Sequence, residues 1–564
     1  MFIRRIGIIS RTYRHMNRYR RILSVLFKYG FGDLIDRLNI GQYLEIGMQM
    51  VSRTRRERME SLTRSERVRM ALEELGPTFT KMGQILSTRP DLIPSEFIAE
   101  LSKLQDSVPP FPFDQVREII EAELKAPVEA LFETFEETPL AAASIGQVHR
   151  ARLRSGEDVV VKVQRPGIRR TIEIDLEILL HLAQLVEKHV AEVGFYKPTR
   201  IVNEFARILE KEIDYTIEAS HTERFARYFS GNPHVYVPKV YREMTSERVL
   251  TMEYAGGIKV SEVEKLDRAG FDRAVIASRG ADLMLEQVFE HGFFHGDPHP
   301  GNIYILPGQV ICYFDFGMMG SVDRKAREDF ADLVYGYVRR DEARTADALL
   351  RIVEWDREPD RRGLERDISE FMELYLYKPL KGIRLKAVLL DMIDLLSRHG
   401  LRLPPDVFLM IKSMTEVEGI GLMLNPDFDL VEKAEPFIRR IKAARYRPGR
   451  IMAELAEYGH EWMKFLRIAP VEFQDLLKQI RQGKTRIGFE HKGLDGLIFE
   501  LDRSSNRIAF SLIISSLIIG SSLIMATDIG PYLFGFPLLG LAGFTIAGIF
   551  GIWLVISIFR SGRL

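Results

Sequence analysis

The chain has 564 residues, and this length predicts two or more folded units, because one hydrophobic core rarely serves so many. Its 79 basic and 79 acidic residues cancel, which excludes the strongly basic balance expected of a nucleic-acid-binding protein. The only cysteine, Cys312, excludes an intrachain disulfide and favours a reducing, cytoplasm-facing domain, and the histidines lack the spacing of a structural zinc site.

The amino end, from Met1 to Gly32, contains arginines and a lysine interleaved with apolar residues and no acidic residue. This mixture is typical of an amphipathic helix at an anionic membrane surface. Arginines interrupt every apolar core that a signal peptide would need. A mitochondrial transit peptide and a plain solvated basic helix remain open alternatives.

A β-rich lobe is predicted from 132 to 163, with strands over 135–144, 146–153 and 159–163 and a turn at Ser155-Gly156. Lys162 lies in the Val-rich third strand. In a kinase, a lysine at this place pairs with the nucleotide phosphates.

The expected nucleotide loop departs from the kinase pattern G-x-G-x-x-G-x-V, because alanines replace its first two glycines and only Gly146 remains. Such a loop is stiffer and more crowded, so we expect nucleotide binding with an altered phosphate geometry. The strand Val249–Tyr254 leads into the hinge expected to meet adenine. The candidate ATP-binding residues are Leu140, Ala141, Ala142, Ala143, Ser144, Gly146, Val148, Lys162, Glu253 and Tyr254.

A helix is predicted from Lys197 to Phe229, and its acidic residues include candidate partners for Lys162. Glu212 and Glu218 lie on different faces of such a helix, so both cannot pair with the same lysine. We favour Glu218, which leaves Glu212 and Asp214 for another basic residue.

The segment His295-Gly-Asp-Pro-His-Pro-Gly-Asn302, followed by Asp315-Phe316-Gly317, matches the phosphate end of a kinase site. Asn302 follows Asp297 at the kinase spacing, and a strand–turn–strand segment brings Asp315 back beside it. The pattern predicts Asp297 as catalytic base and Asn302 with Asp315 as Mg²⁺ ligands for ATP.

The remaining chain is predicted to be helical from about Lys325 to Arg481 without a chemical motif, and then to form a glycine-containing linker. Two uncharged runs, Ile508–Ala526 and Leu538–Phe559, are each long enough to span a membrane. Arginines flank both outer ends, which predicts a hairpin with both ends in the cytoplasm. Gly543, Ala547 and Gly551 form a small-residue face for the first span or a second protomer.

These motifs resemble the UbiB/AarF family of atypical kinase-like proteins, as does Lys81-Met82-Gly83-Gln84, which precedes the lobe. The resemblance implies an α+β, bilobal, protein-kinase-like fold with a helical extension over the site. It implies that Lys81, as a candidate catalytic residue, and Gln84 point at the site, with Glu212 and Asp214 nearby. It also implies a role in ubiquinone biosynthesis, with ATPase or small-molecule kinase activity favoured over protein phosphorylation, and a place in the bacterial inner membrane.

The expected parts are a basic amino-terminal region, a helical extension, the two lobes, a linker and the membrane hairpin, at 1–64, 65–125, 126–258, 259–480, 481–506 and 507–560. The expected partners are membrane lipids, quinone precursors or other ubiquinone-biosynthesis proteins, and a second copy of the chain. Two other functions stay open. One is a phosphotransferase for a small hydroxylated molecule, and the other is a nucleotide-sensing membrane scaffold without turnover.

Overall fold

The computed structural model describes residues 16–32, 62–89, 92–104, 108–189, 198–339, 341–355, 358–376, 384–445, 452, 494–527, 531–533 and 536–560. The chain forms two compact units, Met1–Ile451 and Met452–Leu564. The first half of the expected linker, residues 481–493, and the first fifteen residues lie outside the described part.

The first lobe is built on an antiparallel sheet in the order β1-β3-β4-β6, with β2 paired to β3. Its strands are β1 (Phe132–Phe135), β2 (Ala141–Ala142), β3 (Gly146–Leu153), β4 (Asp158–Gln164) and β6 (Val249–Glu253). The predicted strand over 135–144 is therefore wrong, because the chain leaves the sheet between β1 and β2. The predicted turn at Ser155-Gly156 is confirmed, with Gly156 at φ +100°.

Successive side chains along a β-strand point to opposite faces of the sheet, and those of β4 follow this alternation. Val159, Val161 and Val163 pack with α8 (Phe113–Leu124) in one core. Val160 packs on the other face with Tyr215 and Ala219. Lys162 shares that second face, so the alternation directs its side chain away from α8.

The second lobe contains a four-stranded sheet in the order β5-β10-β9-β7 and a short β11-β8 pair. The strands are β5 (Val235–Tyr236), β7 (Ile258–Lys259), β8 (Phe293–His295), β9 (Ile303–Leu306), β10 (Val310–Tyr313) and β11 (Met319–Ser321). The predicted hairpin before Asp315 is confirmed as β9 and β10, joined at Pro307-Gly308. Cys312 lies in β10 and is fully buried.

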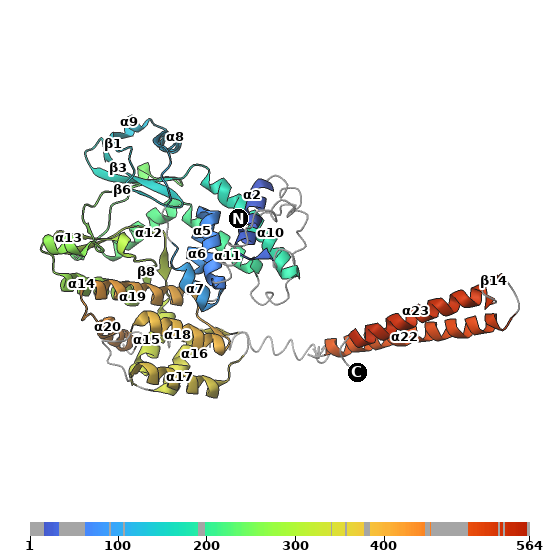
Figure 1. The fold of residues 1–564 in the computed structure, drawn as a ribbon. Helices are drawn as coiled ribbons and strands as arrows, with labels where there is room; N and C mark the ends of the chain where they lie inside the picture. The colour runs from blue at the N-terminus through green and yellow to red at the C-terminus, as the bar shows by residue number, and fades with distance from the viewer. Residues whose placement is uncertain are drawn as a thin grey trace, which may run out of the picture. The chain divides into compact units, whose positions relative to one another are not determined.

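Helices supply the remaining core of this lobe, as predicted, from Arg324 to Arg445 (Figure 1). Residues 446–451 and 453–481 of the predicted helical region lie outside the described part. They are α13 (Val263–Arg268), α14 (Arg273–Leu285), α15 (Arg324–Arg339), α16 (Glu342–Ile352), α17 (Arg361–Leu376), α18 (Leu385–Arg398), α19 (Pro405–Leu424) and α20 (Leu430–Arg445). Shorter elements are η4 (Arg242–Met244), the π-helical η5 (Glu286–His291), η6 (Pro300–Asn302), β12 (Glu354–Trp355) and β13 (Leu401–Arg402). The α+β class predicted from the sequence is confirmed.

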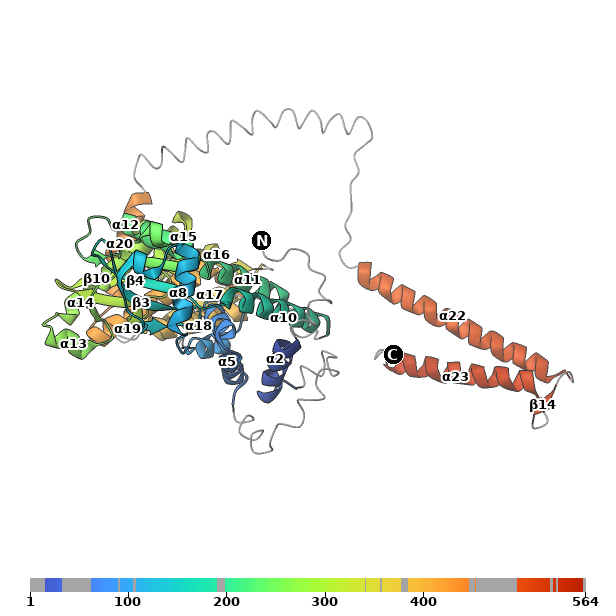
Figure 2. The same cartoon turned by 90° about the horizontal axis from the view of Figure 1, so that it is seen from above.

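A helical extension lies beside the two lobes (Figures 1 and 2). It contains α2 (Met16–Lys28), α5 (Arg64–Leu75), α6 (Pro77–Leu86), α7 (Ser95–Leu101), α10 (Ile168–His189) and α11 (Pro198–Glu212), while α9 (Val128–Leu131) leads into β1. The predicted helix over 197–229 is divided into α11 and α12 (Tyr215–Tyr228). Asp214 ends the continuity, because its carboxylate accepts the Thr216 N–H at 3.0 Å and caps α12.

The apolar face of α2 is used inside the protein, which corrects the expected membrane-surface role for this part of the amino end. Tyr19, Ile22 and Leu23 are almost fully buried in a core shared with α5 and α10. Arg18 forms two hydrogen bonds, of 2.6 and 2.9 Å, with the fully buried carboxylate of Asp175 on α10. Packing within the chain thus takes the surface that a lipid headgroup region would otherwise bind.

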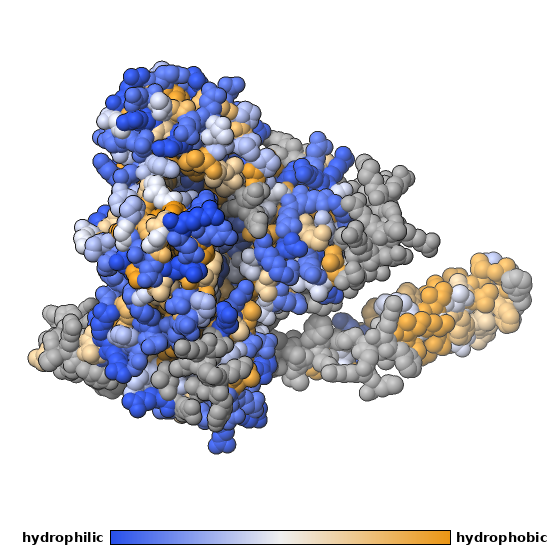
Figure 3. Space-filling model, turned by 60° about the vertical axis from the view of Figure 1, so that its left-hand side comes forward, coloured by the Kyte–Doolittle hydropathy of each residue, from blue (hydrophilic) through white to orange (hydrophobic). Residues whose placement is uncertain are grey.

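The second unit contains a long helical pair, α22 (Leu494–Met525) and α23 (Leu538–Arg560), with the strands β14 (Tyr532–Leu533) and β15 (Phe536–Pro537) between them. Since α22 begins at Leu494, the second half of the predicted linker is helical. Two segments are long and apolar enough to cross a membrane, Ser504–Met525 and Leu538–Ile556, with mean hydropathy 2.2 each. Figure 3 shows their surface as almost continuously hydrophobic.

The small-residue face of α23 packs partly against α22. A Cβ at Gly543 would lie 2.1 Å from Ser521 Oγ, so this close approach requires glycine. Ala547 is 2% exposed, whereas a Cβ at Gly551 would meet nothing within 4 Å.

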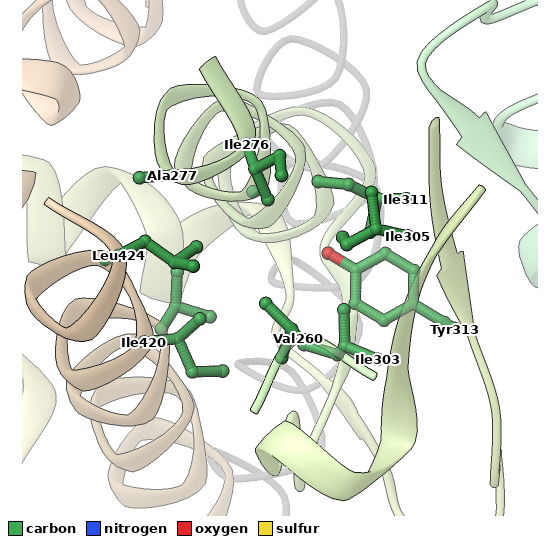
Figure 4. A pocket seen from close by; sticks show the side chains of 12 residues that line it. Val260, Ile276, Ala277, Ile303, Ile305, Ile311, Tyr313, Ile420 and Leu424 are labelled. Carbon is green, nitrogen blue, oxygen red and sulfur yellow. The ribbon is translucent and has the colours of Figure 1, made fainter. Parts of the chain in front are cut away.

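A cavity of about 20 Å³ lies in the second lobe between α14, α19 and the β9–β10 hairpin (Figure 4). Its lining is apolar apart from the Tyr313 hydroxyl, and it is too small for a nucleotide. One hydroxyl is fewer than the two to four polar partners that a buried water needs, so we interpret it as a packing defect.

We predict that Gly280→Ala stabilises the protein by roughly 0.5–1 kcal/mol, because alanine favours the helix and its Cβ meets only Ile311, at 3.7 Å. Gly421→Ala, at the same cavity, should destabilise it by roughly 1–3 kcal/mol, because its Cβ would lie 2.3 Å from the Phe428 ring. Thermal unfolding of both variants checks this pair. A lower unfolding temperature for Gly280→Ala than for the natural chain would contradict this prediction.

We predict that Arg18→Met costs roughly 2 kcal/mol, less than a fully buried pair because Arg18 is 22% exposed. Loss of the guanidinium leaves the Asp175 charge buried without this partner, so α2 should detach first. Trypsin cleavage after Arg20 or Arg21 and chemical unfolding measure the two effects. The exposed Arg21→Met is the control for unfolding and should change stability by less than about 0.5 kcal/mol.

Candidate active site

Lys162, Glu218 and Asp315 meet between the two lobes. Lys162 Nζ lies 2.9 Å from Glu218 Oε2 on α12 and 3.8 Å from Asp315 Oδ1, just after β10. Glu218 is 5% exposed, so its charge lies almost entirely out of water. The expected pairing of Lys162 with Glu218 rather than Glu212 is present, and the separation of α11 from α12 explains why the two glutamates face different partners.

The pKa values of this group follow from its charges. Burial alone would lower the pKa of Lys162, but Asp315 and Glu218 outweigh burial and raise it well above its usual value. Lys162 lowers the pKa of Asp315 from 3.8 to about 2, against the effect of burial and with help from Lys81. Burial raises the pKa of Glu218 despite the neighbouring ammonium. At neutral pH the cluster therefore contains a charged lysine beside an ionised Asp315.

Lys81, on α6, lies near the same cluster. It forms an ion pair with Glu212 at the end of α11, and it is among the charges that lower the pKa of Asp315. Gln84, however, donates to the Leu104 carbonyl at 3.3 Å. The carboxamide of Gln84 thus connects parts of the extension, whereas Lys81 adds a second cation near Asp315.

The catalytic-loop segment is fixed to the strand before Asp315 by His295, which is fully buried. Its Nδ1 accepts the Asp297 N–H at 3.2 Å, so Nε2 carries the proton and donates to the Phe314 carbonyl at 3.1 Å. Burial lowers the pKa of His295, which favours this neutral form. Phe314 N–H also donates to the Asn302 carbonyl at 2.9 Å, and this bond closes the base of the hairpin.

Asn302 and Asp315 are the expected metal ligands. Asp315 adopts φ +58°, and its side chain is 52% exposed, so its carboxylate is accessible to a ligand. Within the described ranges, the Asn302 side chain makes a single long hydrogen bond, in which its Nδ2 donates to the Asp297 carbonyl at 3.5 Å. Phe316 lies in the core with its ring 5.1 Å from the Phe225 ring, and His221 on α12 contacts its carbonyl at 3.0 Å, so the backbone just after Asp315 is held in place.

The alanine-rich segment is tightly packed. Ala143 N–H donates to the Gly146 carbonyl at 2.8 Å, and Ser144 is 1% exposed, with no partner for its hydroxyl among the described residues. Gly146 begins β3, where an added Cβ would lie 2.4 Å from Tyr215 Oη and 2.5 Å from the Val163 carbonyl. This glycine is therefore required by strand packing.

The other nucleotide candidates lie along β3 and β6. Val148 is paired with Lys162 across the sheet, while Leu140 is 51% exposed before β2. Glu253 ends β6 and accepts the Lys239 N–H at 3.2 Å. The Tyr254 ring lies 4.4 Å from the Arg150 guanidinium.

Sequence reasoning missed Lys412 and Glu416, which lie on α19 in the region without a motif. Lys412 Nζ is 3.6 Å from Asp297 Oδ1 and 3.2 Å from Glu416 Oε1. Their separation of four residues predicts one helix face, but the sequence contains no signal that connects this face to a loop over a hundred residues earlier.

We predict that Lys162→Met returns the pKa of Asp315 toward 3.8. A depressed carboxyl pKa contributes stability that is full above 3.8 and is lost as the pH falls to about 2. The variant should therefore lose this pH-dependent part of its stability. Acid unfolding between these values measures it, with Asp315→Asn as the reference that lacks the carboxyl group. If Lys162→Met lost as much stability as the natural chain when the pH falls through this range, the pairing of Lys162 with Asp315 would be refuted.

Comparison with protein families matches three segments of the chain. Residues 103–349 match the ABC1 atypical kinase-like domain, residues 368–429 the UbiB helical domain, and residues 492–560 the ABC1/UbiB kinase-like C-terminal domain. The first contains Lys162, Glu218, Asp297 and Asp315, and the second contains Lys412 and Glu416.

Curated relatives match over most of their length. A "Probable protein kinase UbiB" of Xanthomonas campestris pv. campestris (strain B100) is 34% identical over 513 residues, which cover 89% of this chain and 92% of the relative. An uncharacterised protein in the hydrogenase 1 5′ region of Clostridium pasteurianum is 32% identical over 547 residues, which cover 97% of this chain and 99% of the relative. The chloroplastic "Protein ACTIVITY OF BC1 COMPLEX KINASE 7" of Arabidopsis thaliana is 40% identical over 375 residues, which cover 66% of this chain and 54% of the relative.

Proposed function

Because the chain belongs to the ABC1/UbiB family of atypical kinase-like proteins, we propose that it binds ATP with Mg²⁺ and acts on the terminal phosphoryl group. The position of Lys162, 2.9 Å from Glu218 and 3.8 Å from Asp315, carries this proposal. A lysine held by a helix glutamate beside a metal-binding aspartate is the arrangement with which kinases orient nucleotide phosphates.

Asp315 and Asn302 fit the requirements of Mg²⁺, which typically takes one or two protein oxygens together with phosphate and water oxygens. The Asp315 carboxyl is accessible and ionised at neutral pH, and its pKa is about 2. When bound, Mg²⁺ would neutralise charge on the nucleotide phosphates. Lys162 would then contact the phosphates from the side of the first lobe.

Asp297 is our candidate base. In hydrolysis, a water oxygen forms a bond to the γ-phosphorus while the bond from that phosphorus to the β-bridging oxygen breaks. The water proton passes to Asp297, and the electron pair of the broken bond stays on ADP. A substrate hydroxyl would react in the same way. The His295 hydrogen bond to the Asp297 backbone holds the base in place.

We place this activity at a membrane, in support of ubiquinone biosynthesis. Relatives named "Probable protein kinase UbiB" and the two apolar helices of the second unit support this placement. The substrates of this role would be hydrophobic quinone precursors. Arginines at the outer ends of the helical pair favour a bacterial inner membrane with the kinase-like unit in the cytoplasm.

We predict that Asp315→Asn removes most of the stabilisation by Mg-ATP, because one ligand charge at a dication is lost. Asp297→Asn should keep this stabilisation and lower ATP hydrolysis by about 10²–10⁴-fold. Thermal-shift titration and a steady-state ATPase assay on the full chain measure both effects.

Asp267→Asn is the matched control, since Asp267 is 51% exposed, close to the 52% of Asp315, and forms an ion pair with the half-exposed Arg273 at 3.1 Å. It should leave both readouts unchanged. Unaltered Mg-ATP stabilisation in Asp315→Asn would overturn the metal assignment. Stabilisation without any turnover in the natural chain would instead favour a nucleotide-sensing scaffold.

A further inference from the structure

Helix α19 packs directly against the catalytic loop. The buried Ser413 hydroxyl shares its proton between the Gly296 carbonyl at 3.1 Å and the Leu409 carbonyl of its own helix at 2.8 Å. A Cβ at Gly296 would lie 3.0 Å from the Leu409 side chain. These contacts lie on either side of Lys412 in the helix. The contacts of α19 with Gly296 therefore hold the helix against the loop that contains Asp297. They position Lys412 in addition to its own ion pair with Asp297.

The loop has no cation of its own. No lysine or arginine occurs between Gly280 and Asp323, a range that contains the whole segment from Asp297 to Asp315. Lys412 is 19% exposed, and its ammonium lies 3.6 Å from Asp297 Oδ1. It thus supplies positive charge next to the carboxylate that we propose as base.

The chemistry of the proposed reaction requires charge at this place. A nucleophile hydrogen-bonded to Asp297 would lie about 3 Å from its carboxylate, and the phosphorus under attack would lie beyond it. Negative charge spreads over the equatorial oxygens of the transferring phosphoryl group, and lysine or arginine side chains commonly stabilise it. The Lys412 ammonium, 3.6 Å from Asp297 Oδ1, lies next to the position proposed for this nucleophile.

We propose that Lys412 is a catalytic residue that contacts the terminal phosphate of the bound nucleotide, and that Glu416 holds Lys412 in place and weakens this contact when ionised. This inference rests on the proposed function. It assigns a role in the reaction to the helical region that follows the kinase-like domain.

Glu416 has the properties of such a regulator. Its Oε1 lies 3.2 Å from the Lys412 ammonium in an ion pair, while its Oε2 is buried without a hydrogen-bond partner in the described part of the chain. Burial raises its pKa to about 7, Lys412 and Lys386 on α18 oppose this, and Asp297 adds to it. Protonated Glu416 leaves the three-residue cluster neutral, whereas ionised Glu416 gives it one net negative charge, which repels phosphate.

The first test separates the terminal phosphate from the rest of the nucleotide. In Lys412→Ala, we expect the affinity for a non-hydrolysable Mg-ATP analogue to fall about tenfold, as for one charge-assisted hydrogen bond, and the affinity for Mg-ADP to stay unchanged. The kcat for ATP should fall about 10²-fold. Lys433→Ala on α20 is the control, because Lys433 pairs with Ser278 and Asp282 and should change neither affinity nor kcat.

The second test uses pH. The kcat of the natural chain should decline as the pH rises through about 7, and Glu416→Gln should hold the low-pH value up to pH 8. A side chain with only a structural role would not flatten this profile. The double variant Lys412→Ala/Glu416→Gln leaves no unpaired charge in the pair, so it tests the phosphate contact even where the single variant unfolds.

Equal losses of ADP and ATP-analogue affinity, or a kcat within threefold of the natural chain in the folded double variant, would overturn the role of Lys412. An unchanged pH profile in Glu416→Gln would overturn the role of Glu416. A natural chain that binds the analogue without hydrolysing ATP would overturn the proposed hydrolysis and the catalytic part of the Lys412 role. The affinity comparison would still decide the phosphate contact, because it needs no turnover.

Discussion

The charge of Lys162 is the constraint around which the kinase-like unit is organised. A buried ammonium costs several kcal/mol unless carboxylates surround it, and here the carboxylates come from two distant segments, α12 and the turn after β10. The cluster therefore specifies how the first lobe, α12 and the catalytic hairpin are placed together. His221 and His295 reinforce this placement through backbone carbonyls on both sides of Asp315.

Two further helices, one in the extension and one in the second lobe, bring cations to other acids of the site. Lys81 reaches Glu212 from the extension, and Lys412 reaches Asp297 from the helices of the second lobe. Each carboxylate of the site thus has a lysine partner before any nucleotide arrives. Phosphate binding would exchange these internal pairs for ligand contacts, so the helices that carry the lysines are positioned to respond to the nucleotide.

Sequence patterns predicted the α+β class, the β9–β10 hairpin and the family correctly, because fixed spacings and strand periods are local properties. These patterns failed where contacts between distant segments determine which surface is buried, where a helix ends or why a glycine is needed. The apolar face of α2 meets α10 rather than lipid, the acidic helix breaks at Asp214, and Gly146 serves strand packing. Lys412 remained hidden for the same reason, since only the docking of Ser413 on Gly296 brings α19 to the loop.

The complete burial of Cys312 has a practical consequence. Burial raises the pKa of its thiol well above the usual value, and β10 is covered on both sides, so the group is poorly placed to react with thiol reagents. Since the chain contains no other cysteine, thiol-directed labels should react little with the natural sequence. Spin or fluorescent labels at new surface cysteines on α6 and the first lobe would report the distance between the extension and the sheet without prior removal of native thiols.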